Sequence, residues 1–519
     1  MANKSLFASL AGKLIPKPDA LNSEGAPAYA FTPEHRLAQI AMTGTFNRTF
    51  YADGAAQVEA LLQAAFEVEP SFAARTAIYA RQKGYMKDTP ALLLAWTSML
   101  QTDDFTRAFP KVVDNGKMLR TFVQLMRSGV TGRKSFGTRP KRMVQAWLET
   151  ASDAEILRAS VGNDPSLADV IKMVHPKPKS ASREAFFAWL LGKPHDVAAL
   201  PAIVAEFEAF KRSPEGPVPD VPFQMLTSLP LTKEQWAGIA KKAGWHMLRM
   251  NLQTFARHGV YEVDGMAEAI AARLADPEAV RRAKVFPYQL MQAYSMSETG
   301  VPEVIRVALQ DAMEIATANV PSLDGHVVIC PDVSGSMGSP ATGYRKGATS
   351  KVRCIDVAAL VAAAMLRANN RARVLPFETG VVDIKLNARD SVMTNAAKLA
   401  AIGGGGTNCS APIEKLVAEK AKVDLVVIVS DNESWPDAPR YQAQGTGLMQ
   451  AWGRLKVLNP RAKLVALDIQ PNATTQARER DDVLNIGGFS DQVFEVIAGF
   501  AQGRYSAARW VDAITAIDL

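Results

Sequence analysis

The chain has 519 residues, of which 48% are apolar and 21% are charged. At about 100 to 200 residues per domain this length predicts two to four domains, and the apolar share excludes a mainly disordered protein. Lys and Arg number 59 against 52 Asp and Glu, a net charge of +7 that favours anionic partners and excludes very basic proteins of the histone type. The cysteines are too few for a disulfide framework, which predicts a reducing, cytoplasmic compartment; they are Cys330, Cys354 and Cys409.

The first 30 residues show no export signal. Gly12 and Lys13 interrupt a short mixed stretch that lacks the apolar centre and cleavage site of a secretory signal. We expect residues 1–30 to form an extended arm, because prolines and glycine disfavour helix and strand there: Pro16, Pro18, Gly25 and Pro27. Nowhere does an apolar run approach the roughly 20 residues of a bilayer span, so we expect no membrane association.

From Pro33 to about Val320 the sequence predicts helices almost throughout. Their apolar residues recur at three-four spacing, and short turns join them. Many short helices in succession predict paired helices stacked as a solenoid, with an irregular bundle as the alternative. The clearest expected helices are Ala56–Phe66, Ser71–Arg81, Pro90–Gln101, Met118–Arg127, Arg139–Leu148, Ser182–Leu191 and Ala267–Leu274.

At Pro321 the pattern changes to alternating strands and helices. Strands that are apolar on both faces indicate a parallel sheet covered on both sides, so residues 321–519 are predicted to form a doubly wound α/β domain. We place the boundary near residue 320, which leaves residues 31–320 as the helical domain. The expected strands are Gly325–Cys330, Ala372–Phe377, Val423–Ser430 and Lys463–Ile469, and the expected helices are Ile355–Asn369 and Ala411–Lys420.

Oxygen-bearing side chains follow the expected strands at the edge where open α/β sheets bind ligands. Asp332, Ser334 and Ser336 form a DxSxS motif after the first strand, Thr407 follows a run of four glycines, and Asp431 ends the strand VDLVVIVS. Hard oxygen ligands of this kind suit Mg²⁺ or Mn²⁺, with Ca²⁺ also possible. For Asp332 alone, a helix N-cap is the alternative.

Taken in this order, the three elements resemble the metal-ion-dependent adhesion site of von Willebrand factor A domains, over about residues 324–505. The resemblance implies that Asp332, Ser334, Ser336, Thr407 and Asp431 hold a divalent cation directly or through water, and that an external acid completes the shell. One departure is that Asp431 lies in Ser-Asp-Asn-Glu, where the family commonly has Thr-Asp-Gly.

A catalytic function finds little support in the sequence. No His lies near these motifs apart from His326 inside the first strand, and Glu433 is the only nearby candidate base. We expect Glu433 to be a solvent-facing or supporting carboxylate. P-loop, HExxH, GxSxG and CxxC motifs do not occur, so we predict a protein that is not an enzyme.

The helical half contains a basic stretch, in which the 32 residues 117–148 include eight basic side chains and no Asp or Glu. A loop feeding the start of a helix suits phosphate contacts by side chains and by free backbone N–H groups. A solvated helical face or internal ion pairing is the alternative. The basic residues are Lys117, Arg120, Arg127, Arg133, Lys134, Arg139, Lys141 and Arg142.

A second, smaller cluster contains Lys172, His175, Lys177 and Lys179. The His175 ring could stack on a base of single-stranded RNA, while a helix C-terminal capping role is equally compatible with its position.

Two segments together with the DVSGSM motif resemble the TROVE module of the Ro autoantigen family, in a form typical of bacteria. They are GRKSFGTRPKRMVQAWL from Gly132 and IKMVHPKP from Ile171. The resemblance implies a ring of HEAT-like helical repeats closed by the A domain, with a positively charged hole. His175 matches a histidine implicated in RNA binding, although Val174 replaces a serine beside it. Arg158 matches a basic position, and Gly162 departs from another.

The same resemblance implies the partners. Family members bind small noncoding Y RNA, and the single-stranded 3′ ends of misfolded RNA enter the hole. Bacterial relatives act with a 3′ to 5′ exoribonuclease, polynucleotide phosphorylase, in RNA quality control, maturation of rRNA precursors and the stress response. We expect a monomer. The expected RNA-binding residues are Lys117, Arg120, Arg133, Lys134, Arg139, Lys141, Arg142, Arg158, Lys172, His175 and Lys177.

Three functions therefore compete. The first is an RNA-binding ribonucleoprotein scaffold, and the second is a metal-dependent protein adhesion scaffold whose basic patch meets an acidic partner. The third and least supported is a Mg²⁺-dependent nuclease.

Overall fold

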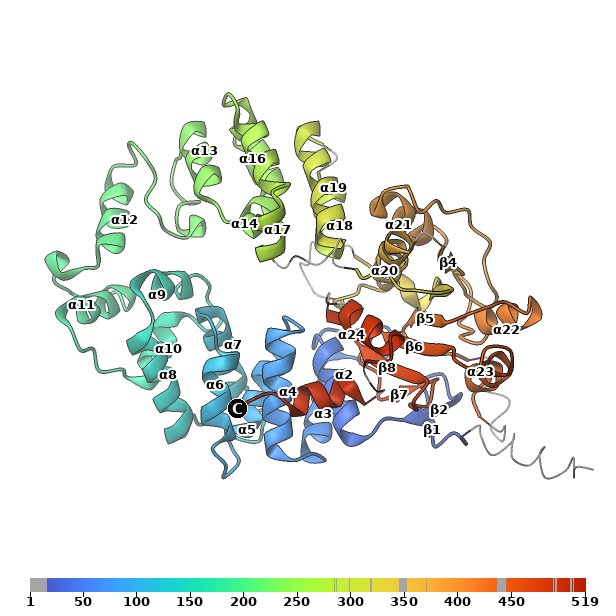
Figure 1. Cartoon of the computed structure of the whole chain (residues 1–519). Coiled ribbons are helices and arrows are strands. Elements are labelled where there is room, and N and C mark those ends of the chain that lie inside the picture. Colours follow the sequence, from blue (N-terminus) through green and yellow to red (C-terminus); the bar gives the residue numbers. More distant parts are fainter. Residues whose placement is uncertain are drawn as a thin grey trace, which may run out of the picture.

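Figure 1 shows the fold in a computed structural model of the chain. The structure describes residues 16–519, with the exception of residues 284, 286, 298, 318–319, 345–351, 370, 436–444, 489, 491, 505 and 507. Of residues 492 and 509 it describes the backbone and not the side chain. An arc of helices runs around the molecule and returns to an α/β domain, so that the two parts close a ring, as the family resemblance implied.

The arc consists of short helices that pack on their neighbours along the chain. Ser152, Ser166 and Thr232 begin helices with capping boxes, which satisfy N–H groups at the helix start. The expected helices are confirmed to within a few residues at each end. The helices are α2 Pro33–Thr43, α3 Gly54–Phe66, α4 Pro70–Gln82, α5 Asp88–Thr97, α6 Asp104–Val112, α7 Gly116–Ser128, α8 Thr138–Thr150, α9 Asp153–Ala159, α10 Leu167–Val174, α11 Ala181–Leu190, α12 Ala202–Arg212, α13 Lys233–Lys242, α14 Trp245–Met250, α15 Leu252–Arg257, α16 Met266–Leu274, α17 Pro277–Ala283, α18 Pro287–Ser295 and α19 Glu303–Thr317.

The α/β domain is doubly wound, as predicted. Its parallel sheet has the strand order β4-β3-β5-β6-β8. Alternate residues of β3 enter two separate cores, since Val327 and Ile329 pack with α20 and Val328 and Cys330 pack with α22 and α23. The elements are β3 Val327–Pro331, α20 Cys354–Ala368, β4 Arg373–Val374, α21 Val392–Ala400, α22 Ala411–Ala418, β5 Leu425–Ser430, α23 Gly447–Leu458, β6 Lys463–Asp468, β7 Thr474–Thr475, β8 Val483–Gly487, α24 Gln492–Ala501 and α25 Arg509–Thr515.

Residues 16–30 are more regular than the sequence suggested. Strands β1 (Ala20–Leu21) and β2 (Pro27–Ala30) form a hairpin, and β2 pairs with β7 of the α/β domain. The Asn22 side chain accepts hydrogen bonds from the backbone N–H groups of Glu24 and Ala26 and so shapes the turn. Composition did not reveal this hairpin, because its partner strand lies more than 440 residues away in sequence.

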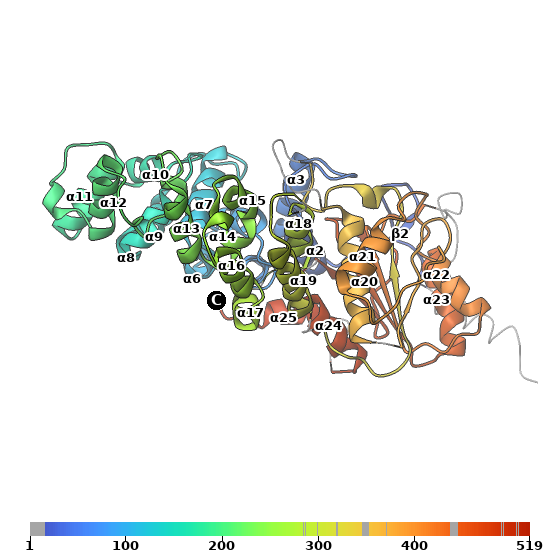
Figure 2. The ribbon, with the colours of Figure 1, turned by 90° about the horizontal axis from the view of Figure 1, so that it is seen from above.

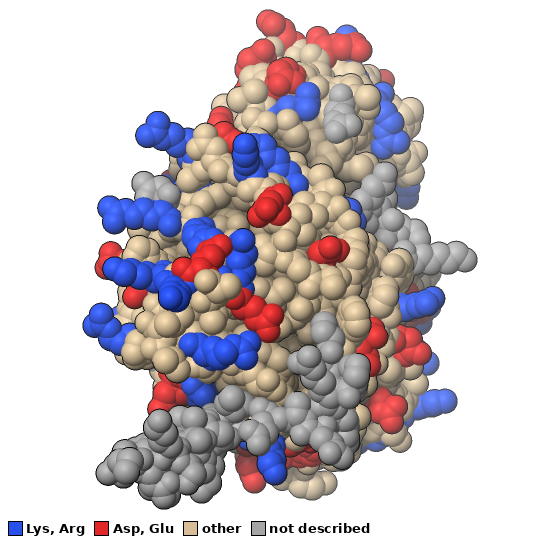
Figure 3. All heavy atoms as spheres, turned by 90° about the vertical axis from the view of Figure 1, so that its right-hand side faces the viewer, with Lys and Arg blue, Asp and Glu red and all other residues tan. Residues whose placement is uncertain are grey.

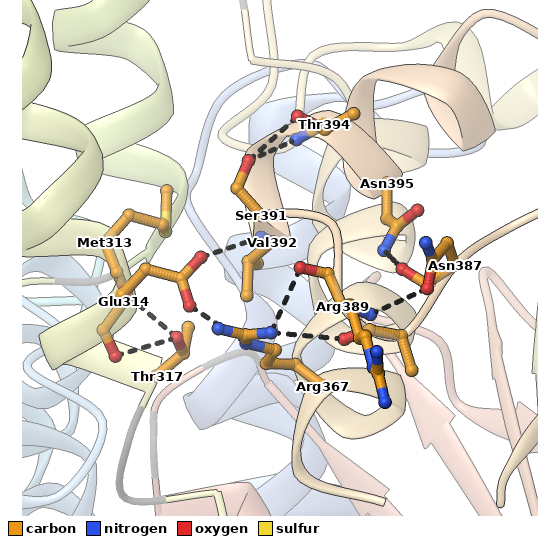
Figure 4. Close-up of polar contacts among 11 residues, drawn as sticks. Met313, Glu314, Thr317, Arg367, Asn387, Arg389, Ser391, Val392, Thr394 and Asn395 are labelled. Atoms are coloured by element: carbon orange, nitrogen blue, oxygen red, sulfur yellow. Dashed lines mark hydrogen bonds and ion pairs between the residues drawn. The ribbon is translucent and has the colours of Figure 1, made fainter. Parts of the chain in front are cut away.

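Both ends of the helical arc contact the α/β domain. At the first end His35 of α2 pairs with Glu479 at 2.7 Å, and at the other Glu314 of α19 accepts from Arg367 of α20 at 3.2 Å and from the N–H of Val392 at 2.9 Å (Figure 4). Figure 2 shows from above that α19 lies beside α20 and α21. The ring is therefore closed by polar contacts on two sides.

The outer face of the α/β domain carries mixed charge. In Figure 3 Lys and Arg lie among Asp and Glu over this side of the molecule. The α/β domain also contains the ion pairs Arg373–Glu419 and Arg454–Glu414. No helix in the described part of the chain is both long and apolar enough to cross a membrane.

Candidate functional site

The DxSxS motif forms a buried turn directly after β3. The Ser334 N–H donates to Asp332 Oδ1 at 2.9 Å, and the Ser334 and Ser336 hydroxyls lie 3.3 Å apart. Asp332 therefore shapes its own turn. The short 3₁₀ helix that follows, Ser336–Gly338, has no side-chain cap, so the N-cap alternative for Asp332 is not supported.

The structure brings the other two expected ligands to the same sheet edge. The Gly335 N–H donates to the Gly405 carbonyl at 3.1 Å, which ties the glycine run before Thr407 to the DxSxS turn. Asp431 follows β5, whose residues pair in register with β3. Ser430 Oγ donates to Asp332 Oδ2 at 2.6 Å. The loop and the two strand ends therefore meet at one edge.

The electrostatics of this edge suit a divalent cation. Asp332 and Asp431 are 0% and 2% exposed, and neither forms an ion pair with a described basic side chain. Burial, reinforced by the charge of Asp431, raises the pKa of Asp332 to about 7, and burial raises the pKa of Asp431 to about 6. Asp431 Oδ1 is buried with no hydrogen-bond partner among the described atoms. A bound cation would supply the partner that Asp431 Oδ1 lacks, and its charge would favour the ionised form of both carboxylates.

The buried residues Ser334, Ser336 and Thr407 add three hydroxyl groups, which are hard oxygen donors, to the two carboxylates of this sheet edge. This donor set fits Mg²⁺ or Mn²⁺ better than softer metals, and in the described residues no group of three His, Cys, Asp or Glu side chains offers another metal site.

The unusual Ser-Asp-Asn-Glu turn retains the backbone conformation of a glycine turn. Asn432 has φ +65°, in the left-handed region that glycine adopts freely and that Asn tolerates better than most residues. Its side chain donates to Thr475 Oγ1 at 3.2 Å. Asn432 therefore adopts a backbone conformation that glycine would also allow at this turn.

Of the two roles expected for Glu433, the structure contradicts the solvent-facing carboxylate and agrees with the supporting carboxylate. Glu433 is 2% exposed and accepts hydrogen bonds from the Ser23 N–H at 2.7 Å and from Ser23 Oγ at 3.1 Å. Burial raises its pKa to about 8. The carboxylate anchors the N-terminal hairpin beside Asp431.

Two residues near the metal ligands were missed. Asp468 ends β6 next to β5, and burial raises its pKa well above the usual range. It ends a buried strand as Asp431 does, so the same sequence signal could have found it. Tyr51 comes from the loop between α2 and α3, and burial together with the nearby charge of Asp431 raises its pKa. No sequence signal points to Tyr51.

Three of the expected RNA-binding residues share one pocket of about 700 Å³. Lys117, Arg120 and Arg158 line it from α7 and α9, and the segment 218–226 with α13 and α14 lines it from the opposite part of the arc. Lys117 and Arg158 are exposed and form no ion pair with a described carboxylate. This pocket therefore presents unpaired positive charge between facing parts of the ring.

Gly162 explains how Arg120 reaches this pocket. A Cβ at residue 162 would lie 2.5 Å from the Arg120 guanidinium, and the φ of +110° there also favours glycine. Burial lowers the Arg120 pKa, and its guanidinium donates to the Pro165 carbonyl at 3.4 Å. The departure at Gly162 thus makes room for a different basic side chain.

A second basic group lies on α8 and α10. Gln145 of α8 donates to the carbonyls of Val174 and His175, and Lys141 and Arg142 lie one turn before Gln145 on the same helix. The backbone of His175, at φ +50°, caps α10, which agrees with the capping role considered for it. Its side chain is exposed, and stacking of the ring on an RNA base stays a prediction. Lys172 and Lys177 are exposed on either side of it.

Two other arginines that were expected to contact RNA form hydrogen bonds with carbonyl groups of the protein's own backbone. Arg139 donates to the carbonyls of Thr102, Ser98 and Leu100 and so closes the end of α5. Arg133 donates to the Phe136 carbonyl at 3.1 Å.

Two further basic side chains of this region are Lys134 and Lys179. Lys134 is exposed, but its aliphatic chain packs on Gly129. Lys179 pairs with Glu149 at 2.9 Å, so internal ion pairing, the alternative considered for the basic stretch, applies to part of the second cluster.

Comparisons with known proteins agree with this architecture. Residues 326–501 match the family model described as the Ro60 vWA domain. Over 518 aligned residues the chain is 24% identical to the RNA-binding protein RO60 of Deinococcus radiodurans, which covers 93% of this chain and 95% of that protein. It also matches the crystal structure of the RO (RSR) protein of Deinococcus radiodurans with a TM-score of 0.61 and 22% identity, covering 91% of this chain and 100% of the other. The structural match shows a shared fold.

Proposed function

We propose that this chain, which is similar to Ro proteins over nearly its whole length, is a ribonucleoprotein scaffold that binds small noncoding Y RNA and the single-stranded 3′ ends of misfolded or structured RNA. The single observation that carries the proposal is the pocket between facing parts of the ring, lined by Lys117, Arg120 and Arg158. The RNA-binding relative over nearly the whole chain supports the same reading.

The pocket suits a single strand in particular. Its basic side chains lie beside apolar ones, including Phe223, Met247 and Met250, so phosphates and unstacked bases both find partners. An RNA duplex keeps its bases paired and stacked and gains nothing from the apolar lining. We therefore assign the pocket to RNA ends, and the exposed basic group on α8 and α10 to the phosphates of an adjacent folded RNA.

In this proposal the protein holds RNA for another enzyme and does no chemistry of its own. It acts as a cytoplasmic monomer with a 3′ to 5′ exoribonuclease such as polynucleotide phosphorylase, joined to it through Y RNA, in RNA quality control, rRNA maturation and the stress response. A divalent cation, with Mg²⁺ favoured, occupies the site formed by Asp332, Ser334, Ser336, Thr407 and Asp431.

The test is charge reversal inside the pocket. The double variant Lys117→Glu, Arg158→Glu is expected to bind a hairpin RNA with a single-stranded 3′ tail about 100-fold more weakly than the unchanged protein, since two phosphate contacts become repulsive. The slope of log affinity against log salt should fall by about 1.4 for two lost single-strand contacts. Filter binding at several salt concentrations measures both quantities.

The matched control is Lys385→Glu, Lys422→Glu, the same charge change at exposed lysines of the α/β domain. An equal loss of affinity in the control would show that net charge alone governs binding, and would contradict the assigned pocket. A blunt hairpin without a tail should lose much less affinity in the pocket variant.

A further inference from the structure

The candidate metal site is covered by the first part of the chain. Its five expected ligands, which belong to the α/β domain, are each at most 8% exposed, although they lie at the sheet edge where a docking site would be open. Tyr51, from the loop between α2 and α3, lies at this edge, close enough for the charge of Asp431 to act on its hydroxyl.

The same loop is attached to the residues that follow the DxSxS motif. The Tyr344 N–H donates to the Arg48 carbonyl at 2.6 Å, and Asn47 Nδ2 donates to the Thr342 carbonyl at 2.9 Å. These contacts hold the 44–53 loop against residues 342–344 and keep Tyr51 at the metal site.

The N-terminal hairpin is attached on the other side, at the residues that follow Asp431. Ser23 donates to Glu433, and Asn22 Nδ2 donates to the Ser434 carbonyl at 2.7 Å. The two N-terminal segments therefore hold the loops on both sides of the ligands.

We propose that the divalent cation joins the helical arc to the α/β domain, with the Tyr51 hydroxyl on the side of the ion that the five ligands leave open. The inference rests on the cation site proposed above. A small divalent cation accepts about six oxygen donors, directly or through water, and the α/β domain supplies five residues. The Tyr51 oxygen is the donor that the arc brings to the remaining side.

An acidic group from outside is a poor occupant for that side. It would have to displace Tyr51, and it would approach next to Glu24, whose negative charge acts on both Asp431 and Tyr51. The site therefore fits an internal joint of the ring better than a docking site for an acidic partner. Since the cation would bind only when arc and domain meet, its binding stabilises the closed ring.

The first test measures Mn²⁺ affinity of the full chain by electron paramagnetic resonance. Tyr51→Phe, which removes one oxygen and keeps the ring, is expected to weaken Mn²⁺ binding about 10-fold, the size of effect seen when groups around a metal's direct ligands are changed. The control Tyr261→Phe also removes one partly buried hydroxyl, which donates to the Leu252 carbonyl far from the site. It should bind Mn²⁺ like the unchanged chain.

The second test follows the joint itself by hydrogen exchange. Adding Mg²⁺ should slow amide exchange in residues 22–26 and 44–53 of the unchanged chain, and should slow it at least threefold less in Tyr51→Phe. Two results would contradict the proposal that the cation joins the arc to the α/β domain, while leaving the cation site itself intact. One is that adding Mg²⁺ does not change amide exchange in these two segments, and the other is that Tyr51→Phe binds Mn²⁺ within twofold of the unchanged chain. A loss of affinity in Glu24→Gln instead would assign the open side to the hairpin carboxylate and overturn the role of Tyr51. Absence of Mn²⁺ binding in the unchanged chain would overturn the cation site as well.

Discussion

Two regions of the molecule differ in how well the sequence predicted the positions of their side chains. They are the edge of the α/β domain that forms the candidate metal site and the basic side of the helical arc. The five oxygen-bearing residues expected at one edge all lie there, buried together. The basic residues expected to form one surface separate instead into a pocket group, a group on α8 and α10, and side chains such as Arg139 that bond to the protein's own backbone.

The reason is the length of the side chains. Asp and Ser are short, so their positions follow the backbone, and the ends of parallel strands lie at a common edge. Arg and Lys have long flexible chains whose charged ends reach several ångströms from the backbone, and Arg can cap carbonyl groups of a neighbouring helix. A count of charges along a helix therefore predicts a basic region without saying which charges remain available.

The largest expected effect tests the independence of the two regions. Asp332→Ala removes one of the two carboxylates of the metal site and should weaken Mn²⁺ binding by more than about 100-fold, beyond the 10 to 100-fold typical of groups around a metal's direct ligands. Affinity for tailed RNA should stay within about twofold under conditions where the ring remains folded, because the basic residues lie elsewhere. Parallel titrations with Mn²⁺ and with RNA measure both, and equal losses would merge the two regions into one site.

The next effect is a dependence of stability on pH in the metal-free protein. Asp332 and Asp431 have folded pKa values of about 7 and about 6, above the ordinary Asp value near 4. The folded chain therefore holds protons that the unfolded chain has lost, and stability should fall as pH rises from about 4 to about 7. Thermal unfolding in chelator at pH 5.5 and pH 8 should show a smaller difference in Asp332→Asn than in the unchanged chain. Excess Mg²⁺ should also reduce the difference in melting temperature between the two pH values. If neither Asp332→Asn nor Mg²⁺ reduces it, Asp332 and Asp431 do not cause the dependence of stability on pH in this range.

A third prediction separates two neighbouring arginines of the basic stretch. Arg139→Ala leaves carbonyls at the end of α5 without a donor and should lower the free energy of unfolding by about 1 to 3 kcal/mol, with RNA affinity of the folded protein unchanged. Arg142→Ala, at an exposed position, should lower RNA affinity several-fold and leave stability within about 0.5 kcal/mol. Denaturant unfolding and RNA binding on both variants check this, and the opposite pattern would contradict the structural assignment of Arg139.

The smallest expected effect concerns His175. His175→Asn keeps a residue that tolerates the left-handed backbone at the end of α10 and removes the exposed ring. Stability should stay unchanged, and affinity for single-stranded RNA should fall only about two- to threefold, as expected for loss of part of one stacking contact. A melting temperature lowered by several degrees would show that the ring is structural.

Local patterns predicted most of the architecture. Helices such as α3 and α4, and strands such as β5 and β6, were expected to within a few residues, because three-four spacing and continuous apolar runs reflect burial directly. The hairpin of residues 20–30 was missed, since β2 pairs with β7 near the other end of the chain. Tyr51 was missed for the same reason, because it approaches Asp431 from a distant part of the chain.

The sequence by itself determined the helical arc, the doubly wound sheet and the short residues of the candidate metal site, because periodicity and strand ends are encoded by neighbouring residues. Only the tertiary structure decided which arginines remain free, what lies over the metal ligands and how the ring closes at Glu479 and Glu314. These features depend on contacts between segments that lie far apart in the sequence. A pattern of neighbouring residues does not predict such contacts.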